Sequence, residues 1–190
     1  MGWEASLSAS GIIGGGIAGL TAGCALRLEG INSVIFERNE SINEHGAGIS
    51  ISPNGLMLLK KLGIDESLLS KSFTPKKVVM RYLNKEMRSF DVQVVTSSRQ
   101  KLLQVIQERY IALGGEILFG HKYEVLNQDS CEVVFKNNQT YKVAHVLACD
   151  GIKSPIRQKY FPSSEKPIYS GYKAWRSIGL STARDIQFYF

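Results

Sequence analysis

A glycine-rich turn at residues 14–19, GGGIAG, constrains the fold of this chain more than any other feature of its sequence. It fits the motif G-x-G-x-x-G and lies between the apolar pair Ile12-Ile13 and residues 17–28, whose apolar side chains recur at helical spacing. In such a strand–turn–helix unit the first glycine permits a tight turn, the second lets a pyrophosphate approach the backbone, and the third lets the helix pack on the strand. The helix N-terminus adds unpaired N–H groups and the positive end of a dipole. The turn therefore predicts a site for a phosphorylated ligand.

An acidic residue supplies the second half of the pattern. Residues 33–37, SVIFE, predict a buried strand that ends on Glu37, 23 positions beyond Gly14. A carboxylate at about this spacing accepts hydrogen bonds from a dinucleotide ribose. A glycine-rich turn alone can be purely structural, but the strand, the helix and the acid together favour a dinucleotide. The polar residues 6–10, SLSAS, disagree with a central parallel strand, so we expect a shortened first strand or a non-native N-terminus.

Two further helices are predicted. Ser52 and Pro53 suit the N-cap and the first position of one helix, and Gly63 suits its end. Residues 97–115 predict the other helix, because apolar residues recur along one face: Leu102, Leu103, Ile106, Tyr110 and Leu113.

Short strands account for most of the remaining sequence. Residues 76–95 predict a β-hairpin that turns at Asn84-Lys85. Further strands are predicted at residues 116–119, 123–126, 132–135 and 141–148, and a loop with a short helix at residues 150–161. From residue 169 the sequence is β-like again. This order predicts an α/β fold with an inserted antiparallel hairpin and the beginning of a second domain.

Composition narrows the classes of function. With 44% hydrophobic and 21% charged residues the chain can bury a core, and no apolar run approaches the roughly 18–20 residues that span a bilayer. The net charge of +6 comes from scattered Lys and Arg, which favours a solvated surface over nucleic-acid binding. Residues 1–10 lack the features of a signal peptide. Cys24, Cys131 and Cys149 form no short metal pair and no disulfide framework, so we expect a cytoplasmic protein without a metal site.

Five motifs in register carry a resemblance to a known family. GGGIAGL with FER, GAGISISPNGLMLLKKLGI, SSRQKLLQVI, ACDGIKSPIR and YSGYKAWRSI occur in this order. Together they resemble the flavoprotein aromatic hydroxylases, which are single-component FAD-dependent monooxygenases of the p-hydroxybenzoate hydroxylase fold and include salicylate and urate hydroxylase-like enzymes. The resemblance implies a Rossmann-like FAD-binding domain with an inserted antiparallel β-hairpin at residues 1–168. It also implies an incomplete β-sheet substrate domain at residues 169–190.

The resemblance implies cofactor roles for two groups of residues near the N-terminus. Gly14, Gly16 and the amides of Ile17 and Ala18 would hold the FAD pyrophosphate. Glu37 would bind the adenosine ribose, with Arg38 beside it.

Further residues are implied along the rest of the chain. Residues 48–50, with Gly48 and Ser50, would run near the flavin. Arg99 would reach the ribose and phosphate region, since a guanidinium is always charged and offers several fixed donors. The Tyr123 backbone would lie by the adenine, and Asp150 would serve both FAD and NAD(P)H. The resemblance identifies no catalytic residue in this chain.

Structural alternatives stay open for several residues. Arg99 can be a surface residue at a helix N-terminus, and Asp150-Gly151 can be a plain turn with Ser154 as a cap. Arg157 is better suited to bracing the structure than to contacting a cofactor. Cys24 and Cys149 are expected to be buried small residues, whereas His121 and His145 are expected on the surface or in strands.

The implied chemistry is carried by the cofactor. NADPH or NADH reduces FAD, reduced FAD reacts with dioxygen, and a flavin hydroperoxide hydroxylates a small, often aromatic, substrate. Proteins of that family are longer, so we expect a truncated enzyme that does not hydroxylate by itself. An open sheet edge after residues 185–190 could let it self-associate. The alternatives are a non-catalytic dinucleotide-binding module and another FAD-dependent oxidoreductase of the same fold.

Overall fold

The computed structural model describes residues 9–42, 48–64, 68–70, 72–83, 85–163 and 167–173. The chain divides into two compact units. One unit contains Met1–Glu44 and Leu102–Tyr172, and the other contains His45–Lys101 and Lys173–Phe190. The second unit therefore interrupts the sequence of the first.

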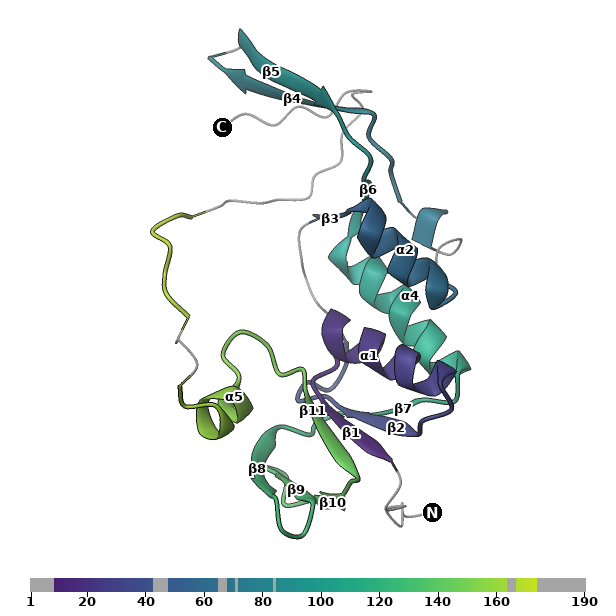
Figure 1. The fold of residues 1–190 in the computed structure, drawn as a ribbon, viewed down its shortest axis with the longest axis vertical. Helices are drawn as coiled ribbons and strands as arrows, with labels where there is room; N and C mark the ends of the chain where they lie inside the picture. Colours follow the sequence, from purple (N-terminus) through teal and green to yellow (C-terminus); the bar gives the residue numbers. More distant parts are fainter. Residues whose placement is uncertain are drawn as a thin grey trace. The chain divides into compact units, whose positions relative to one another are not determined.

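A parallel β-sheet forms the centre of the first unit (Figure 1). Its strands are β1 (Ser10–Ile13), β2 (Ser33–Phe36), β7 (Glu116–Leu118) and β11 (His145–Ala148), in the order β11-β1-β2-β7. Every adjacent pair is parallel. All four residues of β1 are buried, and the Ser10 N–H donates to the Asn32 carbonyl at 2.8 Å. Because Ala9 is already outside the strand, the first strand is short, as one of the two sequence alternatives proposed.

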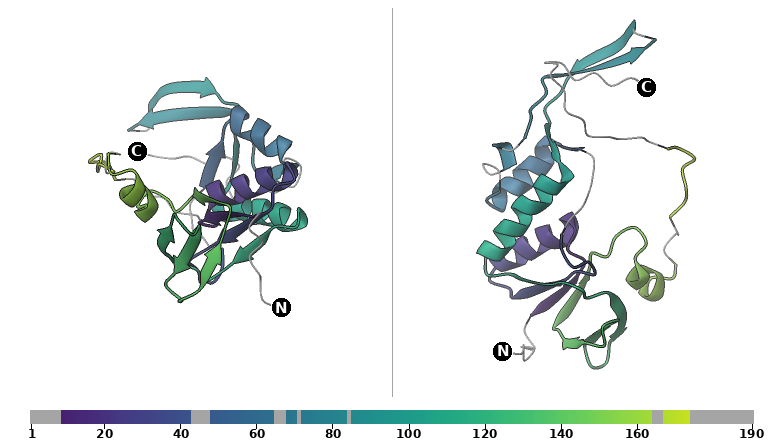
Figure 2. Two further views of the ribbon diagram at one scale, coloured as in Figure 1. Left: turned by 60° about the horizontal axis from the view of Figure 1, so that its bottom comes forward. Right: turned by 180° about the vertical axis from the view of Figure 1, so that it is seen from behind.

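Helix α1 (Ile17–Leu28) connects β1 to β2 and covers one face of this sheet (Figures 1 and 2). Its bounds are the predicted ones, and Gly30 follows with a φ of 74°, which suits glycine at a helix C-terminus. The helix buries Leu20 and Cys24 completely. Burial raises the pKa of the Cys24 thiol to about 11, against a smaller opposite effect of Arg109. Cys24 is therefore a protonated, inert thiol in the core, as predicted.

Helix α4 (Arg99–Ala112) has the buried face that its sequence predicted. The Tyr110 hydroxyl donates to the Ser33 carbonyl at 2.8 Å and ties the helix to β2. Gly23 of α1 permits this approach, because a Cβ there would lie 2.7 Å from the Tyr110 ring. The buried residues of the helix are Leu102, Leu103, Val105, Ile106 and Tyr110.

The start of α4 is a correction to the sequence prediction. Ser97 and Ser98 were expected in the helix, but they belong to strand β6 (Val95–Ser98), which pairs with β3 (Gly48–Ile51). This pairing joins residues about fifty positions apart in the sequence, so the helical spacing of the local sequence did not reveal it.

A three-stranded antiparallel sheet completes the first unit. Its strands are β8 (Tyr123–Asn127), β9 (Glu132–Phe135) and β10 (Thr140–Lys142), in the order β10-β9-β8. The single strand predicted at residues 141–148 is wrong, because the chain leaves this sheet after Lys142 and joins the parallel sheet at His145. The Ala144 N–H, which lies in the break, donates to the Ala9 carbonyl at 2.9 Å. The core between the two sheets comprises Ile13, Val34, Phe36, Tyr123, Val133, Phe135, Val143 and Ile156.

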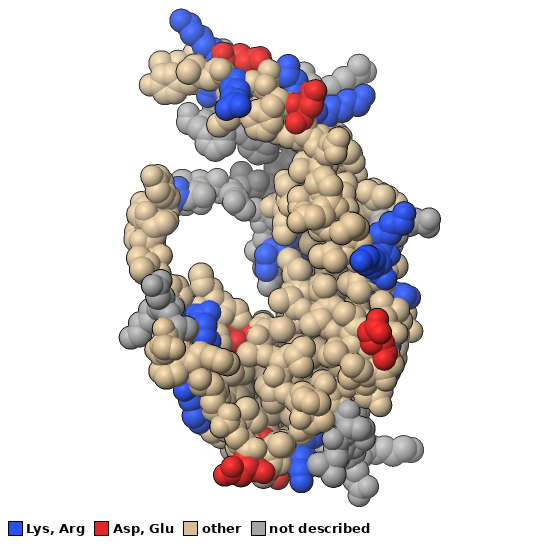
Figure 3. Space-filling view, in the orientation of Figure 1, with Lys and Arg blue, Asp and Glu red and all other residues tan. Residues whose placement is uncertain are grey.

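The second unit contains small antiparallel sheets and a helix. The helix α2 (Pro53–Lys61) starts at the predicted proline, but the Ser52 side chain makes no capping bond. Strands β4 (Lys77–Tyr82) and β5 (Lys85–Asp91) pair in antiparallel fashion where the hairpin was predicted, and Asn84 of the turn lies outside the described residues. On the face shown in Figure 3, basic side chains of this hairpin are interspersed with acidic ones.

The predicted second domain is scarcely represented in the described structure. Of residues 169–190, only Tyr169–Lys173 are described, and they form no strand. The expected sheet edge at residues 185–190 lies outside the described residues. The domain boundary at residue 168 therefore stays a prediction.

Candidate functional site

Three segments of the first unit meet at the carboxyl edge of its parallel sheet. The Gly14 N–H donates to the Phe36 carbonyl at 2.8 Å, which joins the end of β1 to the end of β2. The Cys149 N–H donates to the Ile13 carbonyl at 2.9 Å, which joins the end of β11 to β1. Ligands of open parallel sheets bind at this edge. The site is therefore built from the residues that follow these strands.

Two glycines allow the close packing at this edge. Gly14 has a φ of 110°, and a Cβ on it would lie 2.4 Å from the Cys149 carbonyl oxygen. A Cβ on Gly19 would lie 1.9 Å from the Gly14 carbonyl oxygen. Both distances are far below van der Waals contact, so a larger residue at either position would push the helix or strand away. The two glycines fix the N-terminus of α1 against the sheet edge.

Gly16 differs from these two glycines because open space surrounds it. Among the described residues, no atom lies within 4 Å of the position that a Cβ would take, and its φ of −75° is ordinary. It is the N-cap of α1, no side chain caps the helix there, and the first turn contains no acid. Ile17 is half-buried and Ala18 is exposed. The free N–H groups at the helix N-terminus thus border a space that fits an anionic group such as a pyrophosphate.

Glu37 lies at the same edge and is only 7% exposed. Its Oε2 accepts a hydrogen bond from the Gly15 N–H at 2.7 Å. Its Oε1 accepts two bonds from Asn39, from the backbone N–H at 2.9 Å and from the side-chain amide at 2.7 Å. These bonds use three of the about four acceptor positions of a carboxylate and leave one on Oε2. Glu37 therefore ties the glycine turn to the end of β2, a role that the sequence did not reveal, and keeps capacity for one ligand hydroxyl.

Asp150 adds an unpaired acceptor next to the turn. The Asp150 backbone N lies 3.3 Å from where a Gly14 Cβ would be. Its Oδ2 accepts a long bond from the Ile156 N–H at 3.5 Å, whereas its buried Oδ1 meets no donor among the described residues. A buried polar atom without a partner is costly, so a hydrogen-bond donor from a bound ligand would satisfy it.

The segment after Asp150 also has the structural features of the alternative interpretation. The Ser154 side chain caps helix α5 (Pro155–Tyr160) by accepting from the Arg157 N–H at 2.9 Å. The Arg157 guanidinium donates to the Ile152 carbonyl and so braces the turn, as predicted. Gly151 of this turn is exposed and has a φ of 90°, whereas Asp150 is half-buried.

Tyr123 lies at the start of β8 with its side chain in the core of the first unit. Burial, the neighbouring Tyr160 hydroxyl and the charge of Asp150 raise its pKa, so the phenol stays protonated. Its ring packs in the core and its buried hydroxyl oxygen meets no partner among the described residues, so the predicted contact with adenine concerns its backbone. Arg38 follows Glu37 and is exposed.

The second unit brings its three predicted residues together. Gly48 of β3 pairs with Ser98 of β6, the residue before Arg99, and Ser50 pairs with Thr96. Gly48 and Ser50 are exposed, and Arg99 is half-buried at the start of α4. Within this unit, therefore, Gly48 and Arg99 lie at one end of the two-stranded sheet, and Ser50 lies two positions further along β3.

Two residues that support the site were not predicted from the sequence. Asn39 satisfies Glu37 Oε1 through its backbone N–H and its side-chain amide. His121 was expected on the surface or in a strand, but it is 7% exposed and lies in the loop between β7 and β8. No local pattern indicated its burial, because its partners Phe135 and Tyr141 come from the later hairpin.

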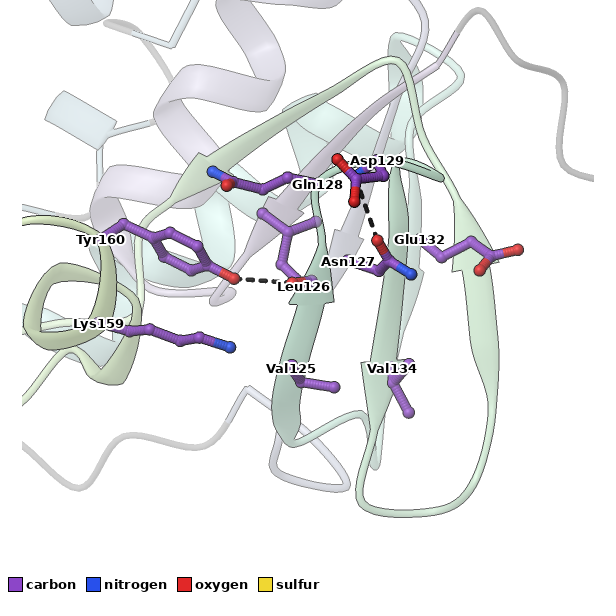
Figure 4. A pocket seen from close by; sticks show the side chains of 9 residues that line it. All are labelled: Val125, Leu126, Asn127, Gln128, Asp129, Glu132, Val134, Lys159 and Tyr160. Atoms are coloured by element: carbon purple, nitrogen blue, oxygen red, sulfur yellow. Dashed lines mark hydrogen bonds between the residues drawn. The ribbon is translucent and has the colours of Figure 1, made fainter.

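A separate pocket of about 540 Å³ lies between β8, β9 and α5 (Figure 4). The Tyr160 hydroxyl closes one side by donating to the Leu126 carbonyl at 2.7 Å. None of the predicted cofactor residues lines it. The lining residues are Val125, Leu126, Asn127, Gln128, Asp129, Glu132, Val134, Lys159 and Tyr160.

Within the described ranges, no three His, Cys, Asp or Glu residues are grouped closely enough to hold a metal ion. No helix in the described part of the chain has the length and apolar character needed to cross a membrane.

The parallel sheet, the glycine turn at a helix N-terminus and the acid at the next strand end define a dinucleotide-binding domain of the Rossmann type. The chain belongs to the FAD-binding domain family, whose model matches residues 8–180. The resemblance that the five motifs predicted is thereby confirmed.

Several relatives are named as monooxygenases. FAD-dependent monooxygenase OpS4 of Beauveria bassiana is 31% identical over 182 residues, covering 88% of this chain and 43% of that protein. 6-Hydroxynicotinate 3-monooxygenase of Pseudomonas fluorescens is 25% identical, covering 88% of this chain and 46% of that protein. The solved tetrameric form of 2-methyl-3-hydroxypyridine-5-carboxylic acid oxygenase superposes with a TM-score of 0.75 at 25% identity, over 82% of this chain and 42% of that one. This chain thus spans less than half the length of these relatives.

Proposed function

We propose that the carboxyl edge of the β11-β1-β2 sheet binds FAD in an NAD(P)H-dependent monooxygenase that hydroxylates a small aromatic substrate. The observation that carries the proposal is the open space at Gly16, with an uncapped helix N-terminus on one side and the buried Glu37 carboxylate tied to the same turn. The family match supports FAD as the dinucleotide. The names of two relatives, which refer to a hydroxynicotinate and a hydroxypyridine carboxylic acid, support an aromatic substrate.

In the proposed complex, backbone N–H groups of Gly16, Ile17 and Ala18 hold the pyrophosphate. They need no induced fit, because the glycine contacts already place the helix N-terminus at the sheet edge. The remaining acceptor position of Glu37 Oε2 takes a ribose hydroxyl. The unpaired Oδ1 of Asp150 accepts a hydrogen bond from the cofactor.

For Arg99, Gly48 and Ser50 the proposal rests on the sequence resemblance and on chemistry alone. Arg99 would provide a fixed positive charge for the phosphate and ribose region, and Gly48 and Ser50, which are exposed, would contact the flavin. Bound FAD supplies electron transfer from the nicotinamide donor to dioxygen, and the protein orients it and excludes water. We assign cofactor binding to these 190 residues and propose that hydroxylation requires the greater length that the relatives have.

Glu37→Gln is expected to weaken FAD binding by roughly ten- to a hundredfold, because a lost charge-assisted hydrogen bond costs about 1.5–3 kcal/mol. The structure adds a second consequence. A glutamine must turn its amide NH₂ toward either the Gly15 N–H or the two Asn39 donors, so we also expect a lower melting temperature.

The measurement is a fluorescence titration of FAD, with thermal unfolding followed by circular dichroism. Glu29→Gln serves as the matched control, because Glu29 is exposed at the other end of α1 and is expected to leave both quantities unchanged. A folded Glu37→Gln protein with an unchanged Kd for FAD would place Glu37 outside the ribose site.

A further inference from the structure

The loop between β7 and β8 holds the turn that carries Glu37. The His121 N–H donates to the Glu37 carbonyl at 2.8 Å, and the Gly120 N–H donates to the Asn39 carbonyl at 3.1 Å. Gly120 has a φ of 70°, which lets two successive N–H groups point at this turn. Both ends of the Glu37–Asn39 turn are therefore bound to one short loop.

The imidazole of His121 fixes this loop in turn. Its Nδ1 donates to the Phe119 carbonyl at 2.6 Å, because a carbonyl can only accept. Since Nδ1 carries the proton, Nε2 accepts from the Tyr141 hydroxyl at 3.1 Å, and the Gln139 side-chain amide, 2.5 Å away, can bond to it only through its NH₂ group. The ring is thus bonded both to its own loop and to the β9–β10 hairpin, which is some twenty residues further along the chain.

Aromatic packing holds the ring from its other sides. Ring centroids of Phe135, Tyr141 and Phe36 lie 5.1, 5.4 and 5.7 Å from that of His121. Phe36 is the last residue of β2 and directly precedes Glu37. The side chain therefore packs against the residue that precedes the Glu37–Asn39 turn, while its backbone holds that turn by a hydrogen bond.

We propose that His121 is a positioning residue for the Glu37 carboxylate. It acts at a distance from the ligand, through the loop of residues 119–121 and the backbone of residues 37–39. Its effect on FAD affinity rests on the proposed function, whereas its effect on the order of the Glu37 turn does not.

The test is His121→Phe in the full 190-residue chain, since phenylalanine preserves the aromatic packing and removes both ring nitrogens. Without ligand, we expect the amides of Gly15 and Asn39, the two backbone donors to Glu37, to exchange hydrogen at least about tenfold faster relative to the Cys149 amide. Cys149 bonds to Ile13 at the same sheet edge and reports general loosening. Two results would overturn the proposal. One is faster exchange confined to the amide at position 121, and the other is an equal increase at the Cys149 amide and at those of Gly15 and Asn39.

A second readout couples His121 to Glu37. His121→Phe is expected to weaken FAD binding by about tenfold in the native background and by less than about twofold when Glu37→Gln is already present. Equal losses in both backgrounds would show that His121 acts independently of Glu37 and would overturn the proposal. If the native chain itself fails to bind FAD, the proposed function fails, and the exchange measurement still decides the role of His121.

Two variants complete the design. Gln139→Ala removes a partner of Nε2 from an exposed position, so it tests the same link without touching the core, and smaller changes in the same direction are expected. If the His121→Phe variant does not fold, Gln139→Ala decides alone. Unchanged hydrogen exchange at the Gly15 and Asn39 amides in that variant would then overturn the proposal. His145→Phe is the matched control, because His145 is exposed in β11 and should change neither readout.

Discussion

Gly16→Asp is expected to raise the Kd for FAD by about a hundredfold or more without lowering the melting temperature. The described part of the chain leaves room for the side chain, because none of its atoms lies within 4 Å of the Cβ position and the backbone φ of −75° suits any residue. Aspartate is a favourable N-cap, so helix α1 should be as stable as before or more so. Its carboxylate, however, would occupy the space proposed for the pyrophosphate, and like charges placed together in an interface cost several kcal/mol.

The measurement is a titration of FAD paired with thermal unfolding of the same samples. Gly16→Ala is the matched control, because it adds a methyl group without a charge and should cost much less affinity. A Gly16→Asp protein that binds FAD within about threefold of the native chain would mean that the pyrophosphate does not lie at this helix N-terminus.

Gly14→Ala is expected to destabilise the fold by about 3 kcal/mol or more, the largest loss of stability among these variants. Two costs act together there. The φ of 110° is strained for any residue with a side chain, and the new methyl carbon would lie 2.4 Å from the Cys149 carbonyl oxygen. Relief requires separating β1 from the end of β11, which opens the parallel sheet at the proposed site.

Gly151→Ala isolates the first of these costs. Gly151 has a φ of 90°, but no atom lies within 4 Å of its Cβ position. We expect it to lose only about 1–2 kcal/mol from backbone strain. Urea unfolding of both variants gives the comparison. Equal losses would show that the contact with Cys149 relaxes freely, and the sheet edge would then be less rigid than the structure indicates.

The parts of the fold that depend on neighbouring residues were predictable from the sequence. Helix α1 has the predicted bounds because a glycine turn starts it, apolar spacing defines its buried face and Gly30 follows its end. Strand β9 and the start of α2 at Pro53 follow from equally local signals. Each of these elements is determined within about a dozen residues.

The parts that depend on distant partners were not predictable in the same way. Residues 141–148 form one continuous strand-like stretch in sequence, yet its first and last residues belong to strands of two different sheets. Ser97 and Ser98 resemble a helix start until their pairing with β3 is known. At the site, sequence spacing placed Glu37 correctly at a strand end, but its bond to the Gly15 N–H and the support from His121 arise only when the chain is folded.

The central claim is that this chain uses its glycine turn and Glu37 to bind FAD rather than NAD. The most direct test is to titrate the purified 190-residue protein with FAD, follow the quenching of flavin fluorescence, and then add NAD as a competitor. We predict saturable one-to-one binding of FAD that excess NAD does not reverse. Displacement of FAD by NAD at comparable concentrations, or the absence of saturable FAD binding in the folded protein, would contradict the account.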